Sequence, residues 1–240
     1  MAGMLPTTSS DDVAADPIDT AVFPVGSFEQ HGRHLPLSTD ALVATAIAER
    51  IAEDYELFRL PVMPLGCSHE HAEFAGTVSI SATTLYAVVN DVAASLARSS
   101  GVRRLVVVNG HGGNYVLSNV VQEANAGGLR MALFPTSADW GDARAEAGVE
   151  TSNHEDMHGG EAETSILLYR FPDLVRPGFD DADHVANDRR HLLVDGMRAY
   201  TTSGIIGRPS LASAEKGERL LAAFSRLFKD HLAVLRNTQE

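Results

Sequence analysis

The sequence predicts an α/β fold in which a mostly parallel sheet carries helices on both faces. Short apolar runs rich in β-branched residues alternate along the chain with longer segments of helical periodicity. The apolar runs show no clean alternation with polar residues, which is typical of parallel strands that are buried on both faces. Together the two patterns favour a sheet whose connecting helices cover it from both sides.

The strands are expected where the chain is continuously apolar. The four main runs cover residues 18–25, 60–65, 105–108 and 130–134, and a brief further strand is expected at 78–80. The run at 105–108 is the clearest strand, because a leucine is followed by three valines.

The helices are expected between these runs, at residues 41–54, 83–99, 115–125, 159–169 and 214–236. Thr39 or Asp40 can cap the first helix, and Ser81 or Thr83 can cap the second. Residues 137–156 fit no single element, and residues 173–213 are expected to be irregular.

The length of 240 residues suits one domain, which we expect at residues 18–240. Residues 1–17 are small, polar and acidic, so we expect a disordered or extended arm there. The arm shows no basic region followed by an apolar core, and Cys67 is the only cysteine, so no intrachain disulfide can form. Both observations fit a cytoplasmic location.

The charge balance excludes two classes of partner. The chain has 32 acidic and 19 basic residues and a formal net charge of −13. Nucleic-acid and anionic-membrane surfaces need an excess of Lys and Arg, so neither partner is expected. No apolar stretch reaches the length of a transmembrane helix.

Polar residues that suit a divalent metal follow the first predicted strand. The segment PVGSFEQHGRHLPLSTD holds Glu29, His31, His34 and Asp40, and carboxylates with imidazoles at close spacing are the donors such a site needs. Glu29 and His31 point the same way if the backbone is extended. The alternative is an ordinary polar surface loop.

Two further motifs carry candidate residues. NGHGGN places His111 among glycines directly after the best strand, and the alternatives are a phosphate-binding turn or a histidine that only caps the turn. HGGEAETS places His158 and Glu161 on one face at a helix start. Glu163 would point elsewhere on a regular helix, so it is either a ligand or an acid that favours the helix dipole.

The segment SHEH, residues 68–71, either lines a pocket or is a solvated loop. Two rival functions follow from the residues alone. One is a non-catalytic α/β module that binds a phosphorylated ligand at NGHGGN. The other is a metal-free enzyme that uses Cys67 with His69.

The segments PVGSFEQHGRHLPLSTD, EFAGT, LVVVNGHGGN and HGGEAETS, in this order, resemble the creatininase family of metal-dependent amidohydrolases. The resemblance is close over residues 22–172. It implies a creatininase-like α/β domain that hydrolyses a C–N amide bond with a water activated by two divalent ions, which are zinc, manganese or iron. It also implies a homo-oligomer, often a hexamer, and a small-molecule or short-peptide substrate.

The resemblance implies roles for individual residues. Glu29 and His111 would bind one metal, His31 would bind the other, and Asp40 would bridge both. His158 would be the catalytic proton shuttle to the leaving amine. Residues expected at the substrate are Ser68, His69, Gly112, Trp140 and His154.

Two departures from creatininase itself refine these expectations. Creatininase carries a glutamate ligand where this chain has Gly113, so we expect Glu161 to supply the missing carboxylate. Creatininase closes its pocket with two tryptophans, whereas this chain has Trp140 and, at the second position, His154. Creatinine is therefore not the expected substrate. Formamidopyrimidine-nucleotide deformylases and mycofactocin precursor peptidases are the alternatives within the family.

Overall fold

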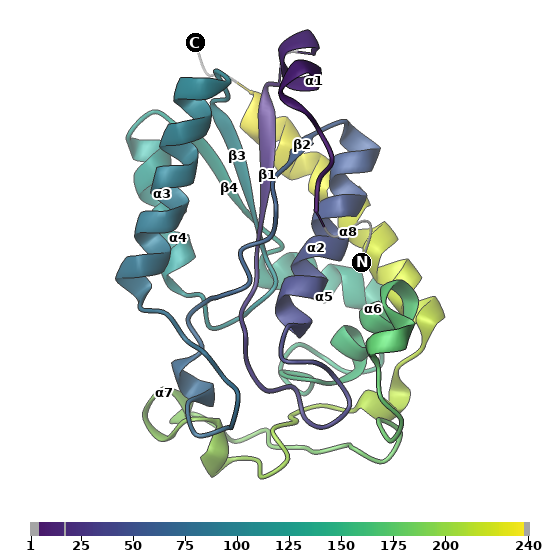
Figure 1. The fold of residues 1–240 in the computed structure, drawn as a ribbon. Helices are drawn as coiled ribbons and strands as arrows, with labels where there is room; N and C mark the ends of the chain where they lie inside the picture. Colours follow the sequence, from purple (N-terminus) through teal and green to yellow (C-terminus); the bar gives the residue numbers. More distant parts are fainter. Residues whose placement is uncertain (1–4, 17, 238–240) are drawn as a thin grey trace.

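A four-stranded parallel sheet forms the centre of the molecule (Figure 1). The computed structural model describes residues 5–16 and 18–237. The strands lie in the order β2-β1-β3-β4, and every neighbouring pair is parallel. Their bounds are Thr20–Val25 for β1, Phe58–Arg59 for β2, Arg104–Asn109 for β3 and Arg130–Phe134 for β4. The predicted α/β class with a parallel sheet is confirmed.

The central strands are buried on both faces, as their continuous apolar runs predicted. All six residues of β1 are buried, and Val22 pairs with Val106 of β3 in the register. Val22 and Val106 face one core, whereas Ala21 and Leu105 face the other.

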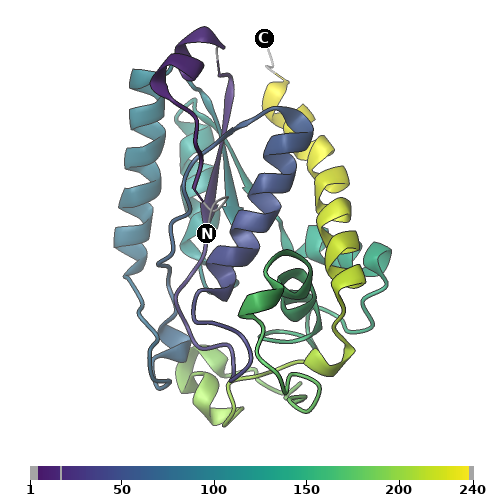
Figure 2. The same ribbon diagram turned by 45° about the vertical axis from the view of Figure 1, so that its right-hand side comes forward.

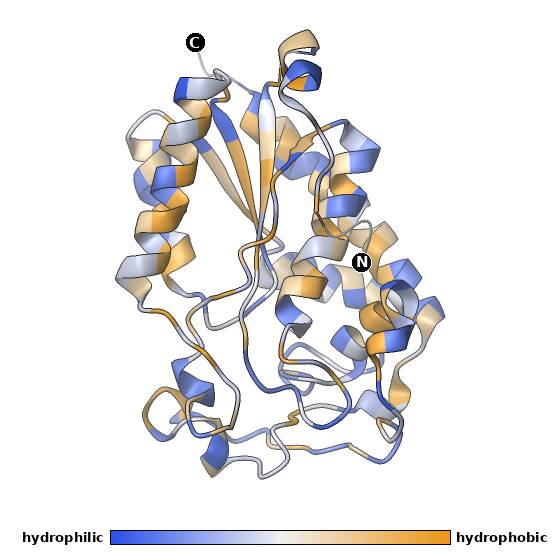
Figure 3. Ribbon diagram, viewed as in Figure 1, coloured by the Kyte–Doolittle hydropathy of each residue, from blue (hydrophilic) through white to orange (hydrophobic). Residues whose placement is uncertain are grey.

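Helices cover both faces of the sheet (Figures 1 and 2). On one face lie α3 (Ala82–Ser99) and α4 (Val116–Ala126). The other face carries α2 (Thr39–Tyr55), α5 (Ser137–Ala147), α6 (Glu161–Arg170) and α8 (Ala214–Arg236). Hydrophilic and hydrophobic bands alternate along α2, α3 and α8 (Figure 3), as expected for helices with one buried side.

Helix caps explain where two of these helices begin. Ser81 is the cap of α3, because its side chain accepts a hydrogen bond from the backbone N–H of Thr84. In the stretch that the sequence left unassigned, Thr136 and Asp139 form a capping box that starts α5. Gly148, with φ of 71°, ends α5 in the left-handed conformation.

Two elements differ from the prediction. The strand expected at 60–65 does not form. The second strand, β2, lies just before that range, and within it only an isolated bridge joins Met63 to Val25, because Pro61 and Pro64 cannot donate to a ladder. The segment expected to be disordered or extended contains α1 (Ser10–Ala15), which Ser9 caps. Residues 1–4 and 17 of that segment lie outside the described residues.

The loops that follow the strands gather at one end of the sheet, at the lower end of Figure 1. The irregular segment between α6 and α8, which includes the short helix α7 (Leu192–Asp195), lies at the same end. This end is where ligands bind in open parallel sheets. Within the described part of the chain, no helix has both the length and the apolar character needed to cross a bilayer.

Candidate metal centre

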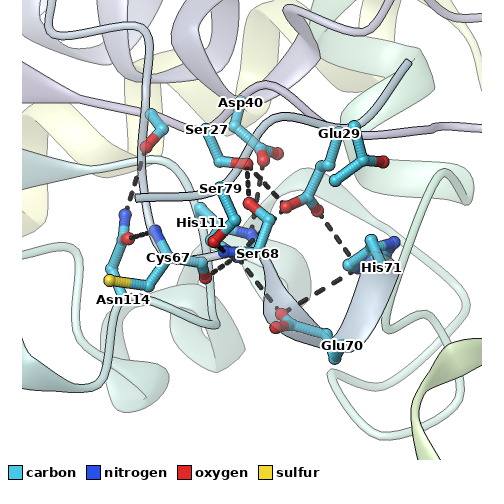
Figure 4. A network of polar contacts seen from close by, with 12 residues as sticks. Ser27, Glu29, Asp40, Cys67, Ser68, Glu70, His71, Ser79, His111 and Asn114 are labelled. Carbon is cyan, nitrogen blue, oxygen red and sulfur yellow. Dashed lines mark hydrogen bonds and ion pairs between the residues drawn. The ribbon is translucent and has the colours of Figure 1, made fainter. Parts of the chain in front are cut away.

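Asn114 joins the three polar loops at this end of the sheet. Its Oδ1 accepts a hydrogen bond from the backbone N–H of Cys67 at 2.8 Å. Its Nδ2 donates to the carbonyl of Gly26 at 3.2 Å and to Oδ1 of Asn109 at 3.0 Å. The segment after β1, the loop after β2 and the turn after β3 are therefore held together, and Figure 4 shows their side chains around one point.

Asp40 lies between two histidines from different loops. It belongs to the first turn of α2, which approaches the turn after β3 so closely that a Cβ at Gly110 would lie 2.2 Å from the Asp40 carbonyl. Oδ1 of Asp40 is 3.0 Å from Nε2 of His31, and Oδ2 is 3.3 Å from Nδ1 of His111. All three side chains are buried.

The backbone sets the orientation of His31. Its Nδ1 lies 3.1 Å from the carbonyl oxygen of Glu29, which can only accept a hydrogen bond. Nδ1 therefore donates to this carbonyl. Nε2 faces the Asp40 carboxylate. Burial opposes a charge on the ring, but Asp40 raises the pKa of His31 well above its usual value, so Nε2 also carries a proton, which a bound metal ion would replace. A histidine whose second nitrogen donates to a carbonyl is the usual arrangement of a metal ligand.

Glu29 is fully buried and lies against histidines on two sides. Its Oε2 accepts a hydrogen bond from Oγ of Ser27 at 2.5 Å and lies 3.2 Å from Nε2 of His111. Its Oε1 lies 3.2 Å from Nε2 of His71. Ser27 is in turn 2.5 Å from Oγ of Ser68, so Ser68 orients Glu29 through Ser27.

Glu163, and not Glu161, joins the group. Oε1 of Glu163 is 3.8 Å from Nε2 of His31, and its Oε2 accepts the N–H of Gly159 at 2.6 Å. The carboxylate of Glu161 instead binds Lys216 at 2.6 Å and the hydroxyl of Thr151 at 2.7 Å. The prediction that Glu161 replaces the missing glutamate is therefore wrong, because buried partners on α8 and in the loop after α5 hold it.

The His158 ring packs against two histidines of this group. Its ring centroid is 4.1 Å from that of His31 and 4.4 Å from that of His71. Its Nε2 donates to the carbonyl of Gln30 at 2.5 Å, which leaves Nδ1 unprotonated, 3.6 Å from Oε1 of Glu29. Burial, and then the neighbouring His31, lower the pKa of His158 to about 4, so its ring is neutral near neutral pH.

The buried charges need compensation. Burial raises the pKa of Glu29 to about 7. Burial opposes the ionisation of Asp40 as well, but His31 and His111 hold the pKa of its carboxyl well below the usual range. Oε1 of Glu29 and Oδ2 of Asp40 are buried and accept no hydrogen bond from any described residue. Buried carboxylate oxygens that accept no hydrogen bond are costly unless a cation lies against them.

Three groups of residues have donor atoms close enough together to hold one metal ion. In each group the donor atoms all lie within 4.8 Å of one another. They are Glu29 with His31 and His158, Glu29 with Glu70 and His111, and His31 with Asp40 and Glu163. The structure thus brings together the predicted residues Glu29, His31, Asp40 and His111, and this donor set suits zinc or manganese.

A cavity of about 480 Å³ opens beside this centre. His111 and Glu163 reach it from the metal side, and Gly112 and Trp140, both expected at the substrate, line it. Trp140 also stacks edge-on against Phe224, with the ring centroids 4.7 Å apart.

Three other residues expected at the substrate lie elsewhere. Ser68 is fully buried behind Glu29. His69 lies 3.2 Å from Oγ of Ser79 and faces a separate cavity. His154 is exposed, and its Nε2 donates to the carbonyl of Asn187. The backbone path of the loops, which residue spacing does not predict, decides these positions.

Two residues of the centre were not predicted, and the role of a third was left open. Glu70 and His71 both lie in SHEH, a segment predicted only to line a pocket or a loop. Glu163 was left undecided, because a regular helix would turn it away from His158. Gly159 and Gly160 precede α6 with non-helical backbone, so His158 is not on the helix and the helical spacing does not apply.

The two rival functions have little support here. Burial raises the pKa of the Cys67 thiol, which disfavours a thiolate nucleophile, and Nδ1 of His69 lies against Oγ of Ser79. Glu29, Asp40 and Glu70 surround His111, and this negative charge would repel a phosphate at NGHGGN.

Comparisons with known proteins agree with the fold. A family model described as creatinine amidohydrolase matches residues 7–231. The mycofactocin precursor peptide peptidase of Mycobacterium tuberculosis is 36% identical over 234 residues, which cover 90% of this chain and 84% of that protein. The creatinine amidohydrolase of Pseudomonas putida is 30% identical over 223 residues, with 83% of each chain covered.

Solved creatininase structures share the fold. One superimposes with a TM-score of 0.78 at 29% identity, covering 94% of this chain and 93% of that chain. Others include a manganese form and a zinc–zinc type, both with a TM-score of 0.75 at 29% identity and with 92% of each chain covered.

Proposed function

The chain belongs to the creatininase family, and on that premise we propose that it is a metal-dependent hydrolase of a C–N amide bond, with two divalent ions and with His158 as the proton shuttle. The observation that carries the proposal is the buried convergence of carboxylates and imidazoles beside a cavity. Two of those carboxylate oxygens, on Glu29 and Asp40, accept no hydrogen bond from the described residues.

The residues divide between two ions. Glu29 and His111 would hold one ion, and His31 and Glu163 would hold the other. Asp40 would bridge them, since its two oxygens face His31 and His111 separately. When bound, divalent ions lower the pKa of a water molecule and polarise an amide carbonyl.

The protein groups handle the protons. Hydrolysis adds a hydroxyl to the carbonyl carbon, breaks the C–N bond and requires a proton on the departing nitrogen. The unprotonated Nδ1 of His158 faces Glu29, so it can take the proton from the attacking water and give it to that nitrogen. The hydrogen bond from Nε2 to the carbonyl of Gln30 keeps the ring in this orientation and stabilises its charged form.

The cavity favours a substrate larger than creatinine. It measures about 480 Å³, more than one five-membered ring needs, and Trp140 gives it an aromatic wall. A short peptide fits this space, and the similarity to a precursor peptide peptidase supports the same substrate class. A formamide of a pyrimidine nucleotide is the second candidate, although the acidic residues around the centre disfavour its phosphate.

The test is a hydrolysis screen of protein loaded with zinc or manganese. Creatinine, formamidopyrimidines and short peptides are offered, and amine release is measured. We expect release from a peptide or a formamide, loss of activity with a chelator and recovery when the metal is returned. Hydrolysis that a chelator leaves unchanged would contradict the proposal.

The quaternary structure belongs to the same proposal. The resemblance to creatininase implies a homo-oligomer, and light scattering of the purified protein would test it. A monomer at micromolar concentration would count against this part alone.

A further inference from the structure

We propose that Glu70 is a further ligand of the ion held by Glu29 and His111, and that it fills the space left by the missing side chain at Gly113. The inference rests on the proposed two-metal function. It concerns a residue of the loop after β2, whereas His111 and Gly113 belong to the turn after β3.

The position of the Glu70 carboxylate is the first argument. Its Oε1 lies 3.3 Å from Nε2 of His111, the same nitrogen that lies 3.2 Å from Oε2 of Glu29 (Figure 4). One donor atom each from Glu29, Glu70 and His111 fall within 4.8 Å of one another. The same nitrogen lies 3.0 Å from the carbonyl of Cys67, which can only accept a hydrogen bond, so Nε2 carries a proton that points among three oxygens and that a metal ion would replace.

Gly113 provides the second argument. A Cβ built on Gly113 would lie 2.3 Å from Oε1 of Glu70 and 2.4 Å from Nε2 of His111. Contacts below about 3 Å do not occur for real Cβ atoms, so Glu70 and a side chain at position 113 exclude each other as this site is arranged. Gly113 has no positive φ, so backbone conformation does not require glycine here. Room for the Glu70 carboxylate and the His111 ring accounts for it instead, together with the Cys67 carbonyl, which would lie 2.8 Å from that Cβ.

The loop holds Glu70 in place from both sides. Glu70 lies in the 3-10 turn His69–His71, whose last residue is buried against Glu29. The N–H of Ser68, just before the turn, donates to Oγ of Ser79 at 2.8 Å. The Glu70 side chain is only 15% exposed and lies 4.0 Å from His71, so its carboxylate is directed inward.

The competing interpretation is that Glu70 only orients His111. Mutation of such an outer partner also lowers metal affinity, by about 10–100-fold, so affinity alone does not separate the two roles. The identity of the preferred metal does separate them. A carboxylate ligand suits manganese, whereas an imidazole favours zinc.

The experiment compares Glu70→Gln and Glu70→His with matched changes at Glu73, an exposed glutamate three residues along the same loop. Metal-free proteins are titrated with zinc or manganese in competition with a chelator, and metal content after dialysis is measured by elemental analysis. Histidine places its Nε2 as many bonds from Cα as glutamate places its Oε1, so it can reach the same position. Thermal unfolding of the metal-free variants checks that the fold is unchanged.

We expect Glu70→Gln to lose one of two ions after dialysis, with its affinity lowered at least about tenfold. Glu70→His should retain both ions and raise the preference for zinc over manganese at least about tenfold, whereas the Glu73 variants should match the wild type. Two ions held with unchanged affinity in Glu70→Gln would overturn the inference. An unchanged zinc-to-manganese ratio in Glu70→His would also overturn it. A wild-type protein that binds no ion would instead refute the proposed function itself.

Discussion

Oδ1 of Asp40 lies 3.0 Å from Nε2 of His31, although a Pro-containing turn and the start of α2 separate the two residues in the chain. Asp40 therefore joins the strand-end loop to the first turn of a buried helix. This contact, with the one to His111, makes Asp40 the residue on which both proposed ion positions depend.

Asp40→Ala should abolish metal binding at both positions. The substitution removes the carboxylate whose two oxygens lie against His31 and His111 separately. Elemental analysis after dialysis should find less than about a tenth of the wild-type metal content. A variant that keeps both ions would show that Asp40 is not a shared ligand.

His158→Gln should retain the metals and lose turnover. General acid–base catalysis contributes about 10²–10⁴-fold, so kcat should fall by that factor while metal content stays at the wild-type value. His191→Gln, a change at an exposed histidine of the irregular segment, serves as the control. Wild-type kcat in His158→Gln would remove the proton-shuttle role.

Glu161→Gln should reduce stability and leave the metals in place. The substitution removes the carboxylate that binds Lys216 at 2.6 Å and Thr151 at 2.7 Å. A buried hydrogen-bonded pair that loses one partner costs about 1–3 kcal/mol, so the free energy of unfolding of the metal-free protein should fall by that amount. Metal content measured on the same sample should match the wild type, and a lost ion would restore Glu161 as a ligand.

Asp139→Asn should destabilise the protein near neutral pH but not in acid. Burial alone would raise the pKa of the Asp139 carboxyl. Hydrogen bonds from the backbone N–H and the hydroxyl of Thr136 lower this pKa by more than burial raises it, so the net pKa lies below the usual value. A group with a depressed folded pKa stabilises above its unfolded pKa of about 4, and this stabilisation is lost as the pH falls through the folded pKa.

Denaturant unfolding of metal-free protein should therefore show a deficit of about 1 kcal/mol for Asp139→Asn at pH 7. The deficit should shrink as the pH falls below about 4. Asp142→Asn, an exposed change on the same helix, controls for the loss of charge. A deficit that is constant with pH would contradict the assigned cause.

Much of the fold follows from sequence patterns because those patterns are local. An apolar run or a helical periodicity indicates directly which residues are buried. The structure has the strands β1, β3 and β4 and the helices α2, α3 and α8 within a few residues of the prediction. The strand predicted at 60–65 is instead found at Phe58–Arg59, because the two prolines that follow leave only one isolated bridge to β1. Residues 137–156 were left unassigned, although the Thr136–Asp139 capping box signals α5.

The site was predicted less completely, because its geometry depends on loop paths. Glu29, His31, Asp40 and His111 follow strands whose ends must meet in a parallel sheet, so their convergence could be expected. Glu70 and His71 come from a loop whose inward turn only the three-dimensional structure reveals. The choice between Glu161 and Glu163 depended on where α6 begins, and two glycines before it move that start beyond His158.

The most direct test of the account is the metal content of the purified protein, measured by elemental analysis together with that of Asp40→Ala. The account predicts about two zinc, manganese or iron ions per wild-type chain and close to none in the variant. A wild-type chain that binds no transition metal even after incubation with zinc and manganese would contradict it.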